Sequence, residues 1–304
     1  MYGPQTVGRD DRSPMEDPMP IRALSSRRRF LVLAVAACAS AALPGPVRAQ
    51  VGKPETITAG ELSVLYNPAT PPTSFIQNGQ PAGMAIDLIA EAAKRLGLKP
   101  VFRAHSDVAG ALPAISNGQY DVAALGLMRT PEREAVVDFT GPWYYGWFPL
   151  VVDRASGIKG YADLRGRVVG AVKGSIQEKW LQDNQPEIRL MAFPNEVGMI
   201  TAINAGSVDG ILMGSAQLAE AMRRYPQLVD VARTPTPYPN AFPLRKGNTT
   251  LRAALDKALA DIVADGTYVR IYDKWHAGNP LPEPLYRDYP SLVGQRKPGE
   301  VGAK

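Results

Sequence analysis

Short apolar runs that favour strands alternate with amphipathic stretches that favour helices, and this alternation limits the possible folds more than any other feature of the chain. From residue 61 the order is strand, helix, strand, helix, strand, in the segments ELSVLY, GMAIDLIAEAAKRLG, PVFRAH, VAGALPAISNG and YDVAALG. Parallel strands need crossover connections of this kind, which are usually helices. The sequence therefore predicts an α/β protein with parallel sheets.

The stretch 83–97 indicates how such a helix should be oriented. Met84 and Leu88 belong to an apolar set that recurs every four residues, whereas Asp87 and Glu91 lie on the opposite face. A helix with this pattern buries its apolar side against a sheet. We therefore interpret the stretch as part of a core and not as a binding element.

A second α/β set follows residue 154, and the tripeptide Phe-Pro-Leu brackets it, at 148–150 and again at 242–244. Two chain crossings between two lobes would produce this layout, and the lobes could then close on a ligand like a hinge. We expect a discontinuous first lobe, 50–147 plus 241–283, and a continuous second lobe, 148–240.

Residues 1–49 have the composition of an export signal. The basic SSRRRF precedes the apolar LVLAVAACASAAL and the small-residue site VRA, and the apolar run is too short for a membrane span of about 20 residues. Ser26 to Leu31 fits the twin-arginine signature, with an ordinary basic leader as the alternative. We expect cleavage after Ala49 and a periplasmic location, with lipidation of Cys38 as the alternative.

Charge and reactive residues argue against several functions. The leader holds seven arginines and four acids, so the formal net charge falls from +5 to +2 after residue 49, which does not suggest a nucleic-acid partner. Cys38 is the only cysteine, His105 and His276 are the only histidines, and the motifs HExxH and GxSxG are absent. The sequence predicts no metal site, no cofactor and no hydrolytic centre.

Seven segments carry recognisable motifs in order: NPATPPTSF, GMAIDLIAEAAKRLG, LPAISNGQYDVAALGLMRTPERE, VVDFTGPWYY, YADLRGRVVGAVKGSIQE, AINAGSVDGIL and LADIVADGTYVRIYDKW. Together they resemble the extracytoplasmic solute-binding proteins of polar amino acid importers, family 3, over nearly all of the chain after the leader. The resemblance implies a type II periplasmic-binding-protein fold, in which two α/β lobes joined by two hinge strands close on a ligand. It also implies a monomer that delivers a small carboxylate-bearing ligand to an inner-membrane ABC permease.

The resemblance further implies that the arginine of the TPER motif, here Arg133, binds the ligand carboxylate. An arginine fork can hold a carboxylate bidentately, helped by free amides at a helix N-terminus in the opposite lobe, here at Ser175. An exposed first-turn arginine is the alternative interpretation of Arg133. The other pocket positions that we expect from the resemblance are Asn67, Thr70, Ser74, Val108, Gly126, Met128, Ile176 and Gly214.

Several of these positions depart from the family pattern. The aspartate that pairs with the ligand ammonium in the family aligns with Gly214, and an ammonium group buried without a counter-charge would lose on the order of several kcal/mol. Met128 and Ile176 replace hydroxyl residues, and Thr70 replaces a tyrosine. We therefore expect a carboxylate without an α-ammonium group, or a ligand of different chemistry. The aromatic run 143–147 is expected to serve packing ahead of ligand contact.

Two other functions stay open on the sequence alone. A few relatives are dehydratases that act on prephenate or arogenate, but their carboxylic general acid aligns with Gln217, which cannot deliver a proton. A ligand sensor or accessory binding protein without a dedicated permease would share the same fold.

The proline-rich tail, 284–304, has no expected function. Its composition favours an extended segment laid on a lobe. We expect its last part, GQRKPGEVGAK from Gly294 onward, to be disordered.

Overall fold

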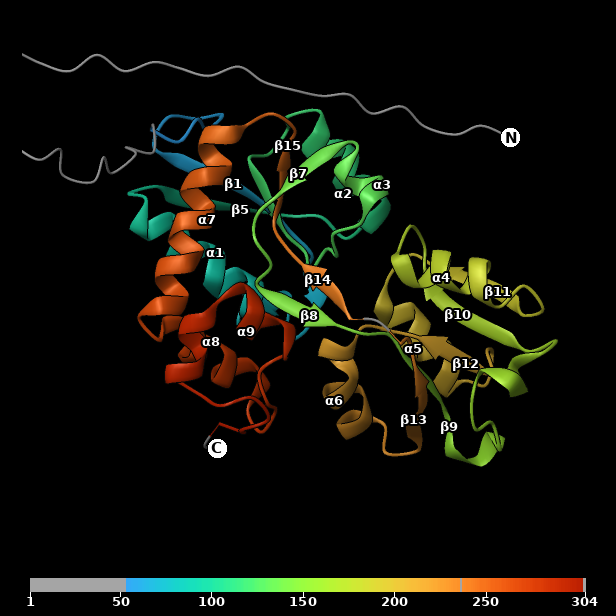
Figure 1. The fold of residues 1–304 in the computed structure, drawn as a ribbon. Helices are drawn as coiled ribbons and strands as arrows, with labels where there is room; N and C mark the ends of the chain where they lie inside the picture. The colour runs from blue at the N-terminus through green and yellow to red at the C-terminus, as the bar shows by residue number, and fades with distance from the viewer. Residues whose placement is uncertain (1–52, 236, 303–304) are drawn as a thin grey trace, which may run out of the picture. The chain divides into compact units, whose positions relative to one another are not determined.

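The computed structural model describes residues 53–235 and 237–302. The predicted signal peptide, its cleavage after Ala49 and the lipidation of Cys38 therefore lie outside the described residues. The described chain forms two lobes, each built on a five-stranded sheet (Figure 1). The predicted α/β architecture is confirmed. Within the described ranges, none of the helices is long and apolar enough to span a bilayer.

The sheet of the first lobe consists of β1 (Glu61–Tyr66), β5 (Lys99–Ala104), β6 (Val122–Ala124), β7 (Val137–Phe139) and β15 (Pro243–Arg245). β1 pairs in parallel with both β5 and β6, and its Leu62 and Val64 are fully buried. β15 comes from much later in the chain and runs antiparallel between β6 and β7, with Leu244 opposite Val122. The strand order is therefore β5-β1-β6-β15-β7.

The first lobe includes the helices α1 (Met84–Arg95), α2 (Val108–Ser116), the single turn α3 (Pro131–Glu134), α7 (Thr249–Ala264) and α8 (Thr267–His276). α1 buries Met84 and Leu88 completely, which confirms the predicted apolar face. On its other side Asp87 accepts hydrogen bonds from Lys274 at 2.7 Å and from the indole of Trp275 at 2.8 Å. These contacts fix α8 against α1.

The second lobe contains the strands β9 (Pro149–Asp153), β10 (Val168–Val172), β11 (Arg189–Phe193), β12 (Gly210–Leu212) and β13 (Leu228–Arg233) in the order β11-β10-β12-β9-β13. β10 pairs in parallel with β11 and β12, while β9 runs antiparallel between β12 and β13. Its helical segments are α4 (Ile176–Asn184), α5 (Glu196–Asn204), α6 (Ser215–Arg224) and the 3₁₀ turns η1 (Arg154–Ser156) and η2 (Tyr161–Leu164).

The chain crosses between the lobes twice, through β8 (Tyr144–Gly146) and β14 (Tyr238–Asn240), which pair antiparallel with each other. After the first crossing Phe148 is buried in the core of the second lobe, and after the return Phe242 is buried in the core of the first. Each copy of the Phe-Pro-Leu tripeptide therefore leads into a different sheet.

A small sheet of β2 (Ala69–Thr70), β3 (Ser74–Gln77) and β4 (Gln80–Ala82) extends from the first lobe. Its tight turn uses positive φ at Asn78 and Gly79, as two-residue hairpins require. The side chain of Asn67 accepts a hydrogen bond from the amide of Ala69 at 2.9 Å, which fixes the entry into β2. This places Thr70 at the edge of the first lobe.

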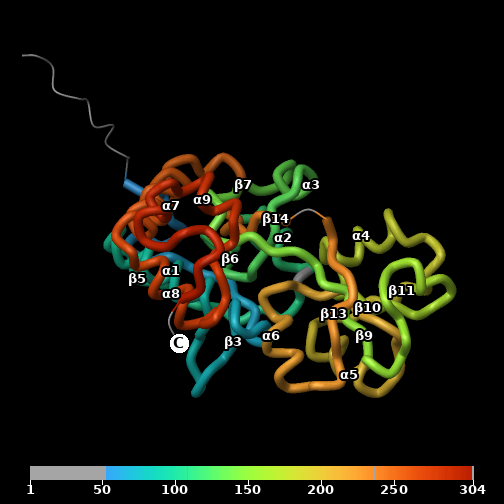
Figure 2. Tube along the Cα trace, turned by 60° about the horizontal axis from the view of Figure 1, so that its bottom comes forward, coloured from blue at the N-terminus to red at the C-terminus, as the bar shows by residue number. Residues whose placement is uncertain are grey.

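The C-terminal segment is helical, so the expected extended conformation of residues 284–294 is wrong. It forms α9 (Pro284–Asp288) and the 3₁₀ turn η3 (Pro290–Gly294), and it lies on the same lobe as α7 and α8 (Figure 2). Leu285 and Leu292 are fully buried in the core of that lobe. The expected disorder from Gly294 onward is also wrong for the described residues, since Arg296 is buried and pairs with Asp273. Burial of the leucines in the core favours helical turns here more strongly than the prolines favour an extended chain.

Candidate ligand-binding site

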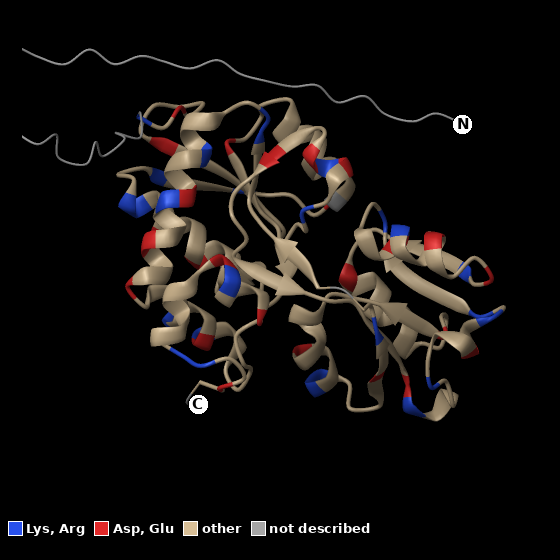
Figure 3. Cartoon of the chain, in the orientation of Figure 1, with Lys and Arg blue, Asp and Glu red and all other residues tan. Residues whose placement is uncertain are grey.

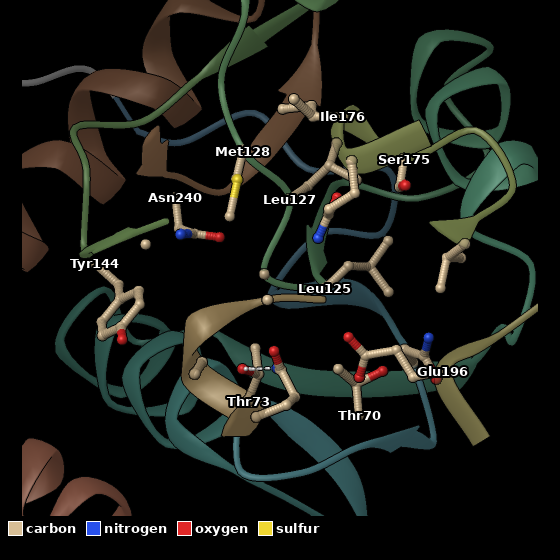
Figure 4. A pocket seen from close by; sticks show the side chains of 18 of the residues that line it. Thr70, Thr73, Leu125, Leu127, Met128, Tyr144, Ser175, Ile176, Glu196 and Asn240 are labelled. Carbon is tan, nitrogen blue, oxygen red and sulfur yellow. Dashed lines mark hydrogen bonds between the residues drawn. The ribbon is translucent and has the colours of Figure 1, made fainter. Parts of the chain in front are cut away.

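A cavity of about 100 Å³ lies between the two lobes. Its wall includes residues just beyond the carboxyl ends of several strands: Asn67 after β1, Leu125 after β6, Ser175 after β10, Glu196 after β11 and Gly214 after β12. Ligands of α/β proteins bind at such strand ends because the loops there are free to carry polar groups. Figure 4 shows side chains from both lobes around this pocket.

Most of the residues expected at the site are brought together here. The first lobe contributes Asn67, Thr70, Gly126, Met128 and Arg133, and the second lobe contributes Ser175, Ile176 and Gly214.

Two of the expected residues are placed differently. Ser74 is fully buried and its hydroxyl donates to the carbonyl of Asn67 at 3.0 Å, so it supports the pocket loop without lining the cavity. Val108 begins α2, and its side chain lies outside the described structure.

Arg133 lies where the lobes meet. Thr130 caps the turn α3 by accepting a hydrogen bond from the amide of Arg133 at 3.3 Å, and Pro131 starts that turn. The guanidinium then donates to the carbonyl of Met128 at 2.8 Å in its own lobe and to the carbonyl of Gly174 at 3.2 Å in the other. Burial lowers the pKa of Arg133 to about 10, so the side chain stays cationic at neutral pH.

The opposite lobe presents a helix N-terminus to the same space. Ser175 caps α4, and its hydroxyl accepts a hydrogen bond from the amide of Glu178 at 3.1 Å. Within the described residues, the first-turn amides of Ile176 and Gln177 have no acceptor in the chain. Such amides can donate to an anionic ligand group.

Gly126 accounts for the close approach of the pocket loop to the small sheet. Its φ is +64°, and a Cβ atom here would lie 2.8 Å from the methyl group of Thr73. Both the backbone conformation and the space therefore favour glycine. The adjacent loop continues to Met128, whose backbone forms a bridge with Asn240 of the return crossing.

Glu196, which the sequence analysis did not single out, also lines the pocket. It is the first residue of α5, and Asn195 caps that helix by accepting a hydrogen bond from the amide of Gly198 at 2.9 Å. Burial raises the pKa of Glu196 to about 7, although a hydrogen bond from the amide of Gly214 acts in the opposite direction. A Glu directly after an N-cap at the carboxyl end of a parallel strand was a signal that could have identified this position, and the sequence analysis missed it.

The aromatic run serves both packing and the pocket. Trp143 stacks on Phe242 with ring centroids 5.4 Å apart, and Tyr144 stacks on His276 at the same separation, so the expected packing role is confirmed. Trp143 and Tyr144 nevertheless also line the cavity. Burial lowers the pKa of His276 to about 4, which leaves this ring neutral.

The fold and this site define a class of protein: two α/β lobes, joined by two crossings, that enclose a small pocket with both polar and apolar walls. The chain belongs to the bacterial extracellular solute-binding proteins, family 3, whose family description matches residues 62–278. Solute-binding proteins of this family serve as the binding components of ABC importers.

Individual relatives agree with this assignment. The ABC transporter arginine-binding protein 1 of Escherichia coli K12 is 31% identical over 204 residues, covering 65% of this chain and 83% of the relative. An ancestral arginine-binding protein, solved with arginine and with glutamine, is 32% identical at a TM-score of 0.68 and matches 72% of this chain and 99% of its own. An ancestral amino acid-binding protein described as a precursor of cyclohexadienyl dehydratase is 29% identical at a TM-score of 0.67, covering 71% and 95%.

Proposed function

We propose that the chain binds an α-amino acid in the cavity between its lobes and passes it to a membrane permease of the ABC type. The observation that carries this proposal is the position of Arg133, a cation in contact with both lobes at the cavity wall. A ligand carboxylate can replace the carbonyl contacts of the guanidinium with stronger, charge-assisted hydrogen bonds. The names of the relatives, which include amino-acid-binding proteins, support the same ligand class.

The proposed closure mechanism rests on the contacts between the lobes. Arg133 and the amides of Ile176 and Gln177 come from opposite lobes, so one carboxylate that contacts both would hold the lobes together. We place the hinges next to β8 and β14, which gives a first lobe of 50–147 plus 241–283 and a second lobe of 148–240.

The test is isothermal titration of the purified chain with a panel of L-amino acids, together with the Arg133→Ala variant. Removing one partner of a buried charge pair costs about 2–5 kcal/mol, so the variant should bind at least about 30-fold more weakly. Arg129→Ala is the matched control, because Arg129 pairs with Glu134 outside the cavity. Unchanged binding by the Arg133 variant would refute the assigned carboxylate anchor.

We propose a binding role without catalysis. Gln217 occupies the position at which the dehydratase acid was expected, and its amide donates to the hydroxyl of Thr73 at 3.0 Å instead of presenting a proton. Recovery of an unchanged ligand after prolonged incubation, measured by mass spectrometry, checks this. Prephenate and arogenate should be included, since conversion of either would show an enzyme.

For partners and location we propose a monomer in the periplasm that has no nucleic-acid partner. Basic and acidic residues are interspersed over both lobes (Figure 3), which does not favour binding to a polyanion. The intact mass of the exported protein distinguishes cleavage after Ala49 from lipidation at Cys38. Light scattering checks the monomer.

A further inference from the structure

Two charged residues line the cavity in the described structure, and they have opposite signs. Arg133 comes from α3 in the first lobe and Glu196 from α5 in the second. Neither has an oppositely charged side chain within ion-pair distance among residues 53–235 and 237–302. A partly buried charge without a partner is unfavourable, so both groups can be stabilised by the opposite charges of a bound ligand.

The carboxylate of Glu196 lies next to the backbone of residue 214. The backbone of Gly214 lowers the pKa of this carboxyl group and both residues line the same cavity, so the acid lies beside the position at which the family's aspartate was expected. α5 also contacts β2 of the other lobe, and Glu196 lies near Thr70 in the pocket (Figure 4). The negative charge therefore lies in the wall between the lobes.

The space at residue 214 is already occupied. A Cβ atom on Gly214 would overlap the side-chain oxygen of Gln217, whose amide nitrogen is held by the buried hydroxyl of Thr73. A side chain at position 214 would require the end of the Gln217 side chain to shift. In this chain the acid that lines the pocket comes from α5, and Gln217 joins the lobes.

We infer that Glu196 binds the ammonium group of the ligand and that the pocket selects amino acids with uncharged side chains. This inference rests on the proposed function. One cation and one anion complement one zwitterion. The remaining polar lining consists of amides and hydroxyls, such as Asn67, Gln177 and Asn240, which can hydrogen-bond a neutral group but cannot neutralise a second charge. This removes the reason for expecting a ligand without an ammonium group.

The experiment is a titration of wild type and Glu196→Gln with L-glutamine and L-leucine and with their counterparts that lack the amino group, 4-carbamoylbutanoate and 4-methylpentanoate. Of L-glutamine and L-leucine, the one that wild type binds more tightly should bind to the variant at least about 30-fold more weakly. The affinity for the corresponding deaminated acid should change by less than about threefold. Glu187→Gln is the control, because Glu187 pairs with Arg165 on the surface. A thermal melt of the ligand-free variant checks that it is folded.

L-Arginine and L-glutamate test the second half of the inference. Each should bind wild type at least about tenfold more weakly than the better neutral amino acid. Tightest binding of either charged amino acid, or unchanged amino acid binding by Glu196→Gln, would overturn the inference. If Arg133→Ala still abolishes binding in that case, the proposed function stands and only the role of Glu196 fails. No binding of any amino acid to wild type would refute both.

Discussion

The side-chain amide of Gln217 donates a hydrogen bond of 3.0 Å to the hydroxyl of Thr73, and this buried contact joins α6 of the second lobe to the loop before β3 of the first. Both groups in this hydrogen bond belong to the protein, so the contact forms without a ligand. The closed arrangement of the lobes is therefore stabilised in part before any ligand arrives.

Thr73→Val removes the hydroxyl and leaves the buried amide of Gln217 without its acceptor. Such a loss costs about 1–3 kcal/mol, which lowers the ratio of closed to open ligand-free protein by about fivefold or more. Small-angle scattering of the ligand-free variant should give a larger radius of gyration than wild type. Thr73→Ser keeps the hydroxyl and should resemble wild type. Identical scattering for all three proteins would show that the contact does not influence closure.

Arg133→Met should separate binding from folding. The variant loses two hydrogen bonds to backbone carbonyls but also loses a buried cation, and these effects offset each other to within about 1 kcal/mol. Urea denaturation of the ligand-free protein should therefore give nearly wild-type stability, while amino acid binding is strongly weakened. A stability loss above about 3 kcal/mol would assign Arg133 a structural role.

The affinity for amino acids should depend on pH through Glu196. Its pKa is about 7 without ligand, and an ammonium group binds the deprotonated form, so binding releases a proton when the pH is below 7. The other ionisable groups of the pocket do not titrate there, because the pKa of Arg133 is about 10 and burial raises that of Tyr144. Titrations between pH 8 and pH 5 should show affinity falling below pH 7, by at most about tenfold per pH unit. Glu196→Gln should show a flat profile.

The same group should give the opposite trend in ligand-free stability. Burial raises the pKa of Glu196 in the folded state above its ordinary 4.5, so the protonated acid is more compatible with folding than the carboxylate is. Its contribution is fully present below pH 4.5 and is lost as the pH rises through 7. Between pH 4.5 and pH 7 the free energy of unfolding of wild type should therefore fall relative to that of Glu196→Gln, as measured by denaturation at several pH values. A constant difference would contradict the raised pKa.

The C-terminal segment should contribute substantially to stability. Leu292→Ala removes a fully buried side chain and should lower the free energy of unfolding by about 2–5 kcal/mol. Val293→Ala, at a neighbouring position that is 55% exposed, should change it by less than about 0.5 kcal/mol. Urea denaturation of both variants checks the comparison. Equal effects would mean that the segment does not pack as described.

Elements with a strong local pattern were predictable from the sequence. The four-residue repeat of α1 identified its buried face. The α/β alternation identified the fold class. In each case residues that are close in the sequence determine the structure, so the local pattern is sufficient to predict it.

Glu196 and the tail illustrate what the sequence pattern did not show. Glu196 reaches the pocket because the carboxyl end of β11 lies near those of β10 and β12, and this neighbourhood depends on sheet order. The sequence analysis treated Gly214 as a missing negative charge because it considered that position alone. It therefore did not predict that Glu196 of α5 would lie in the same pocket. Leu285 and Leu292 are buried through contacts with α7 and its neighbours, which outweigh the local influence of proline.

Trp143 lines the cavity and is only 3% exposed, whereas Trp147, Trp180 and Trp275 do not line it. A ligand that enters the cavity lies next to this indole, whereas the other three indoles lie outside the cavity wall. The protein thus carries its own fluorescent reporter, and the tryptophan emission can follow the arrival of a ligand in real time without an attached dye.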